Sequence, residues 1–65
     1  MMMKTVYDVQ QLLKRFGTII YTGNPLGDLE LIQDEVRELY NQRMIDVNDF
    51  KQAIIIIRAA VNKLQ

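Results

Sequence analysis

The sequence predicts an all-α fold, a compact three-helix bundle with an extended, irregular connection between the first and second helices. Three stretches, at about residues 5–16, 28–43 and 46–64, carry apolar side chains at helical spacing, and each starts near a good helix cap. The β-branched stretch at residues 18–22 has no second stretch with which to form a sheet. A chain of 65 residues has room for one domain, which we place at residues 1–65.

The first helix is predicted by its cap, its apolar stripe and its stop signal. Thr5 is a good N-cap, and Asp8 follows three residues later, where a capping box has its acidic member. One apolar stripe then runs along Val6, Val9, Leu12, Leu13 and Phe16. Gly17 comes next, where the end of a helix favours a residue that tolerates positive φ.

The connection is predicted to be extended first and then to turn. The side chains of residues 18–22 favour an extended backbone, so we expect this stretch to cross the bundle and to press Ile19 or Ile20 into the core. Residues 23–27, Gly-Asn-Pro-Leu-Gly, are typical of a turn. The second helix is expected to start near Asp28, although Asn24 followed by Pro25 would start it earlier.

The second and third helices are predicted by the spacing of their apolar residues. In the second, one face carries Leu29, Ile32, Val36, Leu39 and Tyr40, while the opposite face carries Glu30, Asp34 and Glu38 with Leu31 beside them. The third helix has Asp46 as its cap, and Ile45 and Phe50 stand at the positions of a hydrophobic staple. Its stripe consists of Phe50, Ile54, Ile57, Val61 and Leu64.

Two isoleucines of the third helix, Ile55 and Ile56, lie off this stripe. One interpretation is that a bundle this small packs the helix on two sides, which makes Ile56 a second flank of the core. The other is that Ile55 and Ile56, together with Leu31, form a surface for self-association or for a protein partner.

The outer face of the first helix predicts a second kind of surface. Tyr7, Gln10, Gln11 and Lys14 lie opposite the apolar stripe, with Arg15 at the margin. An exposed tyrosine can stack on a base and a nearby lysine can hold a phosphate, so this face favours weak binding of single-stranded nucleic acid. Alternatively, Tyr7 folds back over the connection as peripheral core. Lys51 and Arg58 would join the face only if the third helix lies beside it.

Catalysis is not expected, because the chain has neither histidine nor cysteine. Zinc sites, cysteine nucleophiles and Ser-His-Asp triads each lack an essential group. Residues 28–32 lack the third acidic ligand and the glycine of a calcium loop, and residues 23–27 lack the Gly-Lys-Ser/Thr ending of a phosphate loop. We therefore expect no enzyme activity, no cofactor and no metal.

The charge pattern limits the kinds of partner that we expect, and the hydropathy pattern indicates the cellular compartment. Eight basic and eight acidic residues cancel, but residues 1–27 carry +2, residues 28–49 carry −5 and residues 50–65 carry +3. Neutrality excludes a bulk polycation and leaves room for a local phosphate site away from the acidic second helix. No apolar stretch is long enough for a signal peptide or a membrane span, so we expect a cytoplasmic protein with no membrane partner.

Several stretches of the chain closely resemble the YqgQ-like family of small bacterial cytosolic proteins. They are residues 7–14 (Tyr-Asp-Val-Gln-Gln-Leu-Leu-Lys), Ile20-Tyr21-x-Gly23, residues 34–40 and Met44-Ile45. The resemblance covers about residues 5–61 and implies a three-helix bundle in a family without an established function. For that family, binding of single-stranded nucleic acid has been proposed on structural grounds, and the resemblance implies no catalytic residues. Residues 54–57 are more apolar here than in the family pattern, and residues 24–27 are an extra segment.

Overall fold

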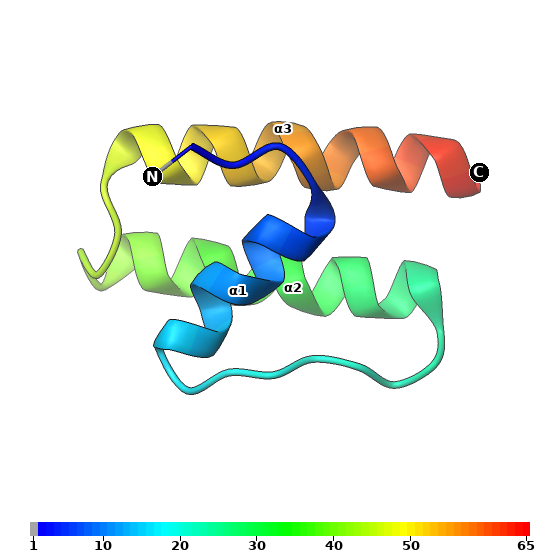
Figure 1. Ribbon diagram of the computed structural model, residues 1–65, viewed down its shortest axis with the longest axis horizontal. Helices are drawn as coiled ribbons and strands as arrows, with labels where there is room; N and C mark the ends of the chain where they lie inside the picture. Colours follow the sequence, from blue (N-terminus) through cyan, green and yellow to red (C-terminus); the bar gives the residue numbers. More distant parts are fainter. Residues whose placement is uncertain (1) are drawn as a thin grey trace.

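The computed structural model describes residues 2–65, and within them the chain forms three helices: α1 (Val6–Arg15), α2 (Pro25–Asn41) and α3 (Val47–Leu64). The predicted all-α three-helix fold is confirmed. α2 and α3 lie side by side and antiparallel, and α1 crosses them (Figure 1). The segment before α1 follows α3, and the connection after α1 returns along α2 (Figure 1). This arrangement fits within 30 × 20 × 17 Å.

α1 has the cap and the stop that its sequence predicts. The hydroxyl of Thr5 accepts the N–H of Asp8 at 3.3 Å, and the Asp8 carboxylate accepts the N–H groups of Lys4 and Thr5 at 2.9 and 3.1 Å. These hydrogen bonds lower the pKa of the Asp8 carboxyl, and the bond from the N–H of Lys4 has the largest effect. At the other end Gly17 has a φ of +84°, which allows the N–H of Thr18 to donate to the carbonyl of Leu13.

The connection crosses the bundle in an extended conformation, as expected. Ile20 packs against the core, whereas Ile19 is exposed. Side chains alternate between two sides in an extended chain, so burying Ile20 turns both of its neighbours outward.

Of the two starts that the sequence allows for the second helix, the one near Asp28 is wrong and the earlier one at Asn24 and Pro25 is confirmed, because α2 begins at Pro25. Asn24 is the N-cap, and its side-chain oxygen accepts the N–H of Gly27 at 3.0 Å. Asp28 has a different role. It is buried, and one carboxylate oxygen accepts both the backbone N–H and the hydroxyl of Thr22. The acidic residue that resembled a cap in fact anchors the connection.

α2 also ends two residues before the predicted limit, at Asn41. Arg43 has a φ of +60°, in the left-handed region. This conformation lets the N–H of Met44 donate to the carbonyl of Leu39 at 2.8 Å. The helix therefore terminates as α1 does, but with an arginine in the position where α1 has a glycine.

The core is formed by the apolar stripes of the three helices and by one residue that lies outside them. Val9, Ile32, Val36 and Ile57 are completely or almost completely buried. Met3 is buried too, held over α3 by a bond from its N–H to the side-chain oxygen of Gln52 at 2.9 Å. No periodicity predicts Met3, because it precedes the first helix. At the other end, Leu64 belongs to the predicted stripe but is exposed.

The junction of α2 and α3 is closed by an aromatic pair. The rings of Tyr40 and Phe50 stack with centroids 4.3 Å apart and planes inclined by 13°. Asp46 caps α3 by accepting the N–H of Asp49 at 2.8 Å, and the preceding Ile45 is buried in the core. α2 and α3 therefore form a firm antiparallel pair against which α1 and the connection pack.

Candidate nucleic-acid interface

The outer face of α1 is set by the residues that the helix buries. Val9, Leu12 and Leu13 point into the core, so the helical period of 3.6 residues directs Tyr7, Gln11 and Lys14 away from it. Tyr7 is 64% exposed, which excludes the alternative that it is peripheral core. Lys14 lies two turns beyond Tyr7 on the same face and is exposed as well.

A hollow of about 220 Å³, which we call the α1 hollow, lies between α1 and the connection. Gln10, Gln11 and Lys14 form the helical wall, and Lys14 is the charged residue among those that line it. The other residues that line it are Leu13, Thr18, Ile19, Ile20, Tyr21 and Ile32. Amide, hydroxyl and ammonium groups therefore surround a space whose floor is apolar.

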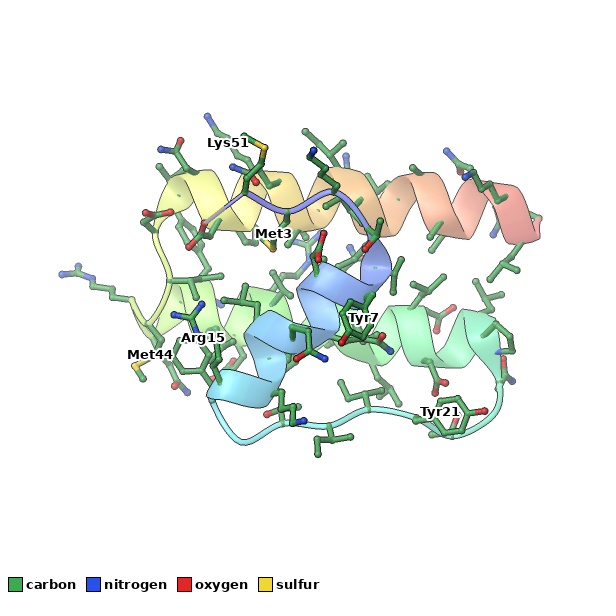
Figure 2. The ribbon with its side chains drawn as sticks, viewed as in Figure 1. Met3, Tyr7, Arg15, Tyr21, Met44 and Lys51 are labelled. Carbon is green, nitrogen blue, oxygen red and sulfur yellow. The ribbon has the colours of Figure 1, made fainter. Side chains whose placement is uncertain are left out.

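The connection presents Tyr21 at the edge of this hollow. Its ring is 83% exposed, and Figure 2 shows it projecting from the connection beside the N-terminal end of α2. The segment is fixed at both ends, because Thr18 donates to Glu35 at 3.3 Å and Thr22 donates to Asp28. Within residues 2–65, the N–H groups of residues 19–21 make no hydrogen bond. The extended segment therefore offers backbone donors as well as an aromatic ring.

A second hollow, of about 400 Å³, lies on the other side of Tyr21, and we call it the apolar hollow. Gln10, Tyr21 and Ile32 line both hollows, so they form the divide between them. The apolar hollow is lined mainly by hydrophobic side chains, with Lys63 of α3 among them. Asp28 also lines the apolar hollow, but its carboxylate already accepts the hydrogen bonds from Thr22. The bond from the Thr22 hydroxyl is the largest of the effects that lower the pKa of Asp28, and burial acts in the opposite direction and raises it.

Not all of the predicted basic residues line these hollows. Arg15 lies at the C-terminal end of α1, next to Lys14 in sequence but about 100° further around the helix (Figure 2). Lys51 lies on α3 beside the segment that carries Met3, on the opposite side of the view from Tyr21 (Figure 2). Arg58 lies two turns beyond Lys51 on α3, and neither residue lines either hollow. The structure therefore does not bring Lys51 or Arg58 to either hollow.

The residues predicted for self-association divide between core and surface. Ile56 is half-buried and packs against the core, as the first interpretation has it. Ile55 is 68% exposed, and Leu31 on α2 is 48% exposed.

The described chain contains no group of three or more His, Cys, Asp or Glu side chains that could hold a metal ion. For residues 2–65, none of the helices is both long and apolar enough to cross a membrane.

Three residues of the connection, Thr18, Ile19 and Tyr21, belong to the site although the sequence did not single them out for it. A signal for them does exist. Once one residue of an extended stretch is assigned to the core, alternation directs its neighbours outward. The missing information was which of Ile19 and Ile20 is buried, and that depends on tertiary packing.

The fold and this surface define the molecule as a small three-helix protein with an exposed tyrosine–lysine face. Residues 3–63 match the model of the YqgQ-like family, and the chain belongs to that family. A relative from Bacillus subtilis (strain 168), named "Uncharacterized protein YqgQ", is 45% identical over 56 residues, which are 86% of this chain and 79% of the relative. The resemblance seen in the sequence is therefore confirmed.

Proposed function

We propose that this protein binds single-stranded nucleic acid through the α1 face and the connection, as a binding module of the cytoplasm and not as an enzyme. The binding surface comprises Tyr7, Gln10, Gln11, Lys14 and Arg15 of α1 with Thr18, Ile19 and Tyr21 of the connection. The observation that carries the proposal is the exposed ring of Tyr21 at the edge of a hollow whose other wall holds Lys14.

The chemistry of this surface suits a single strand better than a duplex. Bases of a single strand are free to stack on aromatic rings, whereas bases of a duplex are already stacked on one another. Tyr7 and Tyr21 supply two exposed rings, and Lys14 supplies a charge for a phosphate. The amide groups of Gln10 and Gln11 and the unbonded N–H groups of residues 19–21 can donate to base edges or phosphate oxygens.

The same set of groups predicts that binding is weak. Lys51 and Arg58 line neither hollow, so two cations lie at the site, Lys14 and Lys63, and Arg15 is a third at the margin of the α1 face. For a single strand the salt slope is about −0.7 per phosphate neutralised, which gives a slope of about −1.5 to −2. Between 50 and 200 mM salt, affinity should then fall by roughly tenfold.

The test is a fluorescence-anisotropy titration of a labelled oligothymidylate of about ten nucleotides, a length within the usual range of site sizes. We expect saturable binding at low salt, the slope given above, and weaker binding to a duplex with the same number of phosphates. No binding at low salt contradicts the proposal. Equal affinity for single strand and duplex also contradicts it, because it would mean that the rings do not contribute.

A further inference from the structure

A groove along α3 contains none of the α1 or connection residues proposed to bind nucleic acid, although it shares Val6, Ala60 and Lys63 with the lining of the apolar hollow. We call it the α3 groove; it has a volume of about 380 Å³ and lies between α3 and the segment that precedes α1. Its apolar residues on α3 are Ile55, Ile56, Ala59 and Ala60, and its charged residues are Lys4 and Lys63. The bond between the N–H of Met3 and Gln52 holds the preceding segment against α3, so the groove has two fixed walls.

The rim of the α3 groove is basic. Ile55 is exposed near its centre, Lys51 lies one turn before it and Arg58 one turn after it on the outer side of α3. Lys4 and Lys63 line the groove, and Lys51 and Arg58 flank Ile55 along α3. The nearby carboxylate is that of Asp8, which accepts the N–H groups of Lys4 and Thr5. A partner that fits must present an apolar side chain among carboxylates.

The outer face of α2 has this chemistry. Leu31 is 48% exposed, and exposed carboxylates follow it at Asp34 and Glu38. One oxygen of Glu38 accepts the side-chain amide of Gln42 at 2.8 Å, which fixes the carboxylate and leaves its second oxygen for another donor. All three side chains are exposed in the described chain, so every copy carries the partner surface.

The spacing of charges on the two helices also agrees. With a rise of 1.5 Å per residue, Asp34 and Glu38 lie about 4.5 and 10.5 Å beyond Leu31 along α2. Arg58 and Lys63 lie about 4.5 and 12 Å beyond Ile55 along α3. A parallel alignment with Leu31 over Ile55 therefore brings two carboxylates to two cations, whereas the antiparallel alignment brings only Asp34 near Lys51.

We propose that the α3 groove binds the acidic face of α2 of a second copy of this chain, with Leu31 seated beside Ile55 and Ala59. The contact joins two different faces, so a pair of copies keeps one free α3 groove and one free α2 face, and association need not stop at two copies. It depends on ion pairs at an exposed rim and should weaken with salt.

The proposal is tested by sedimentation velocity at protein concentrations up to about 1 mM. This range detects self-association with a Kd as weak as about 1 mM. We expect the average mass of the wild-type chain to rise with concentration. Ile55→Asp should remain monomeric, whereas Val47→Asp, at another exposed apolar position of α3, should associate as the wild type does. A wild-type chain that stays monomeric over the whole range overturns the proposal.

A charge-reversal pair identifies the partner face. The variant Asp34→Lys/Glu38→Lys and the variant Arg58→Glu/Lys63→Glu should each be monomeric, and the average mass of their mixture should rise with concentration as that of the wild type does, because both faces of one variant are then complementary to the faces of the other. If the α2 variant still associates by itself, or if the mixture does not associate, the α2 face is not the partner. Circular dichroism establishes that each variant is folded, and Ile55→Asp supplies an independent disruption that leaves all native charges in place. Binding of the oligonucleotide at low concentration should survive Ile55→Asp, which separates this contact from the proposed function.

Discussion

Thr22 donates both its backbone N–H and its hydroxyl to the same carboxylate oxygen of the buried Asp28. This pair joins the end of the connection to the first turns of α2, one residue away from the exposed ring of Tyr21. The bonds therefore have two effects: they satisfy a buried carboxylate, and they hold the extended segment in the position from which Tyr21 borders both hollows.

The Thr22–Asp28 pair makes stability depend on acid. The hydrogen bonds lower the pKa of Asp28 below its ordinary value of 3.8, so folding gains stability above that value and loses it as the pH falls through the lowered pKa. Thr22→Val removes the hydroxyl donor, the largest cause of the lowered pKa, and Asp28→Asn removes the titrating group. Urea denaturation at pH 7 and at pH 3 should show both variants less stable than wild type at pH 7 but less sensitive to acid. An unchanged difference between the two pH values would contradict this role.

The register of α3 predicts unequal effects for two isoleucines two residues apart. Ile57 is 0% exposed and Ile55 is 68% exposed. Ile57→Ala should lower the free energy of unfolding by about 2–5 kcal/mol, enough to leave a chain this small largely unfolded, because a cavity forms in a packed core. Ile55→Ala should change it by no more than about 0.5 kcal/mol. Chemical denaturation of dilute samples checks both, and equal losses would show that the register is wrong.

Arg43 predicts a stabilising substitution. Its φ of +60° costs a residue with a Cβ about 1–2 kcal/mol, and glycine avoids this cost but gains about 0.5–1 kcal/mol of freedom in the unfolded chain. Arg43→Gly should therefore stabilise the protein by about 0.5–1 kcal/mol and raise Tm by roughly 3–6 °C. Arg43→Ala keeps the strain and is the control. If Gly and Ala at this position give the same Tm in a thermal denaturation, the left-handed conformation does not limit stability.

The ring of Tyr21 predicts the largest effect on nucleic-acid binding. Loss of one stacked base costs about 1–3 kcal/mol, so Tyr21→Ala should weaken binding by about 5- to 150-fold. Tyr21→Phe keeps the ring and should bind nearly as well as wild type. Since the side chain is exposed, neither change should alter the circular dichroism spectrum. Equal affinity of the two variants in the anisotropy titration would mean that Tyr21 does not stack on a base.

Much of the fold can be read from the sequence where the signals are local. The Thr5–Asp8 capping box, the stop at Gly17 and the cap at Asp46 act within a few residues, and the structure contains all three. The start of α2 was harder to predict because Asn24 and Asp28 are both acceptable caps by sequence. The contact with Thr22 decides between them, and that contact exists only once the connection lies along α2.

The candidate site, like the fold, can be predicted from the sequence only where its geometry depends on a single helix. Helical geometry placed Tyr7, Gln11 and Lys14 on one face, since that depends on the period of a single helix. The contribution of Tyr21 depends on which isoleucine of the connection is buried. The separation of Lys51 from the two hollows depends on how α1 crosses the α2–α3 pair (Figures 1 and 2). Both of these are tertiary properties, and residue spacing does not determine them.

The central claim, that the α1 face and the connection bind single-stranded nucleic acid, is tested most directly by a ¹H–¹⁵N correlation spectrum titrated with the oligothymidylate. We predict that the amide shifts that change cluster in residues 7–15 and 18–22, including the unbonded N–H groups of residues 19–21. Amides around Ile55 in the α3 groove should not move. Shifts confined to α3 near Lys51 and Arg58, or no shifts at low salt, would contradict the claim.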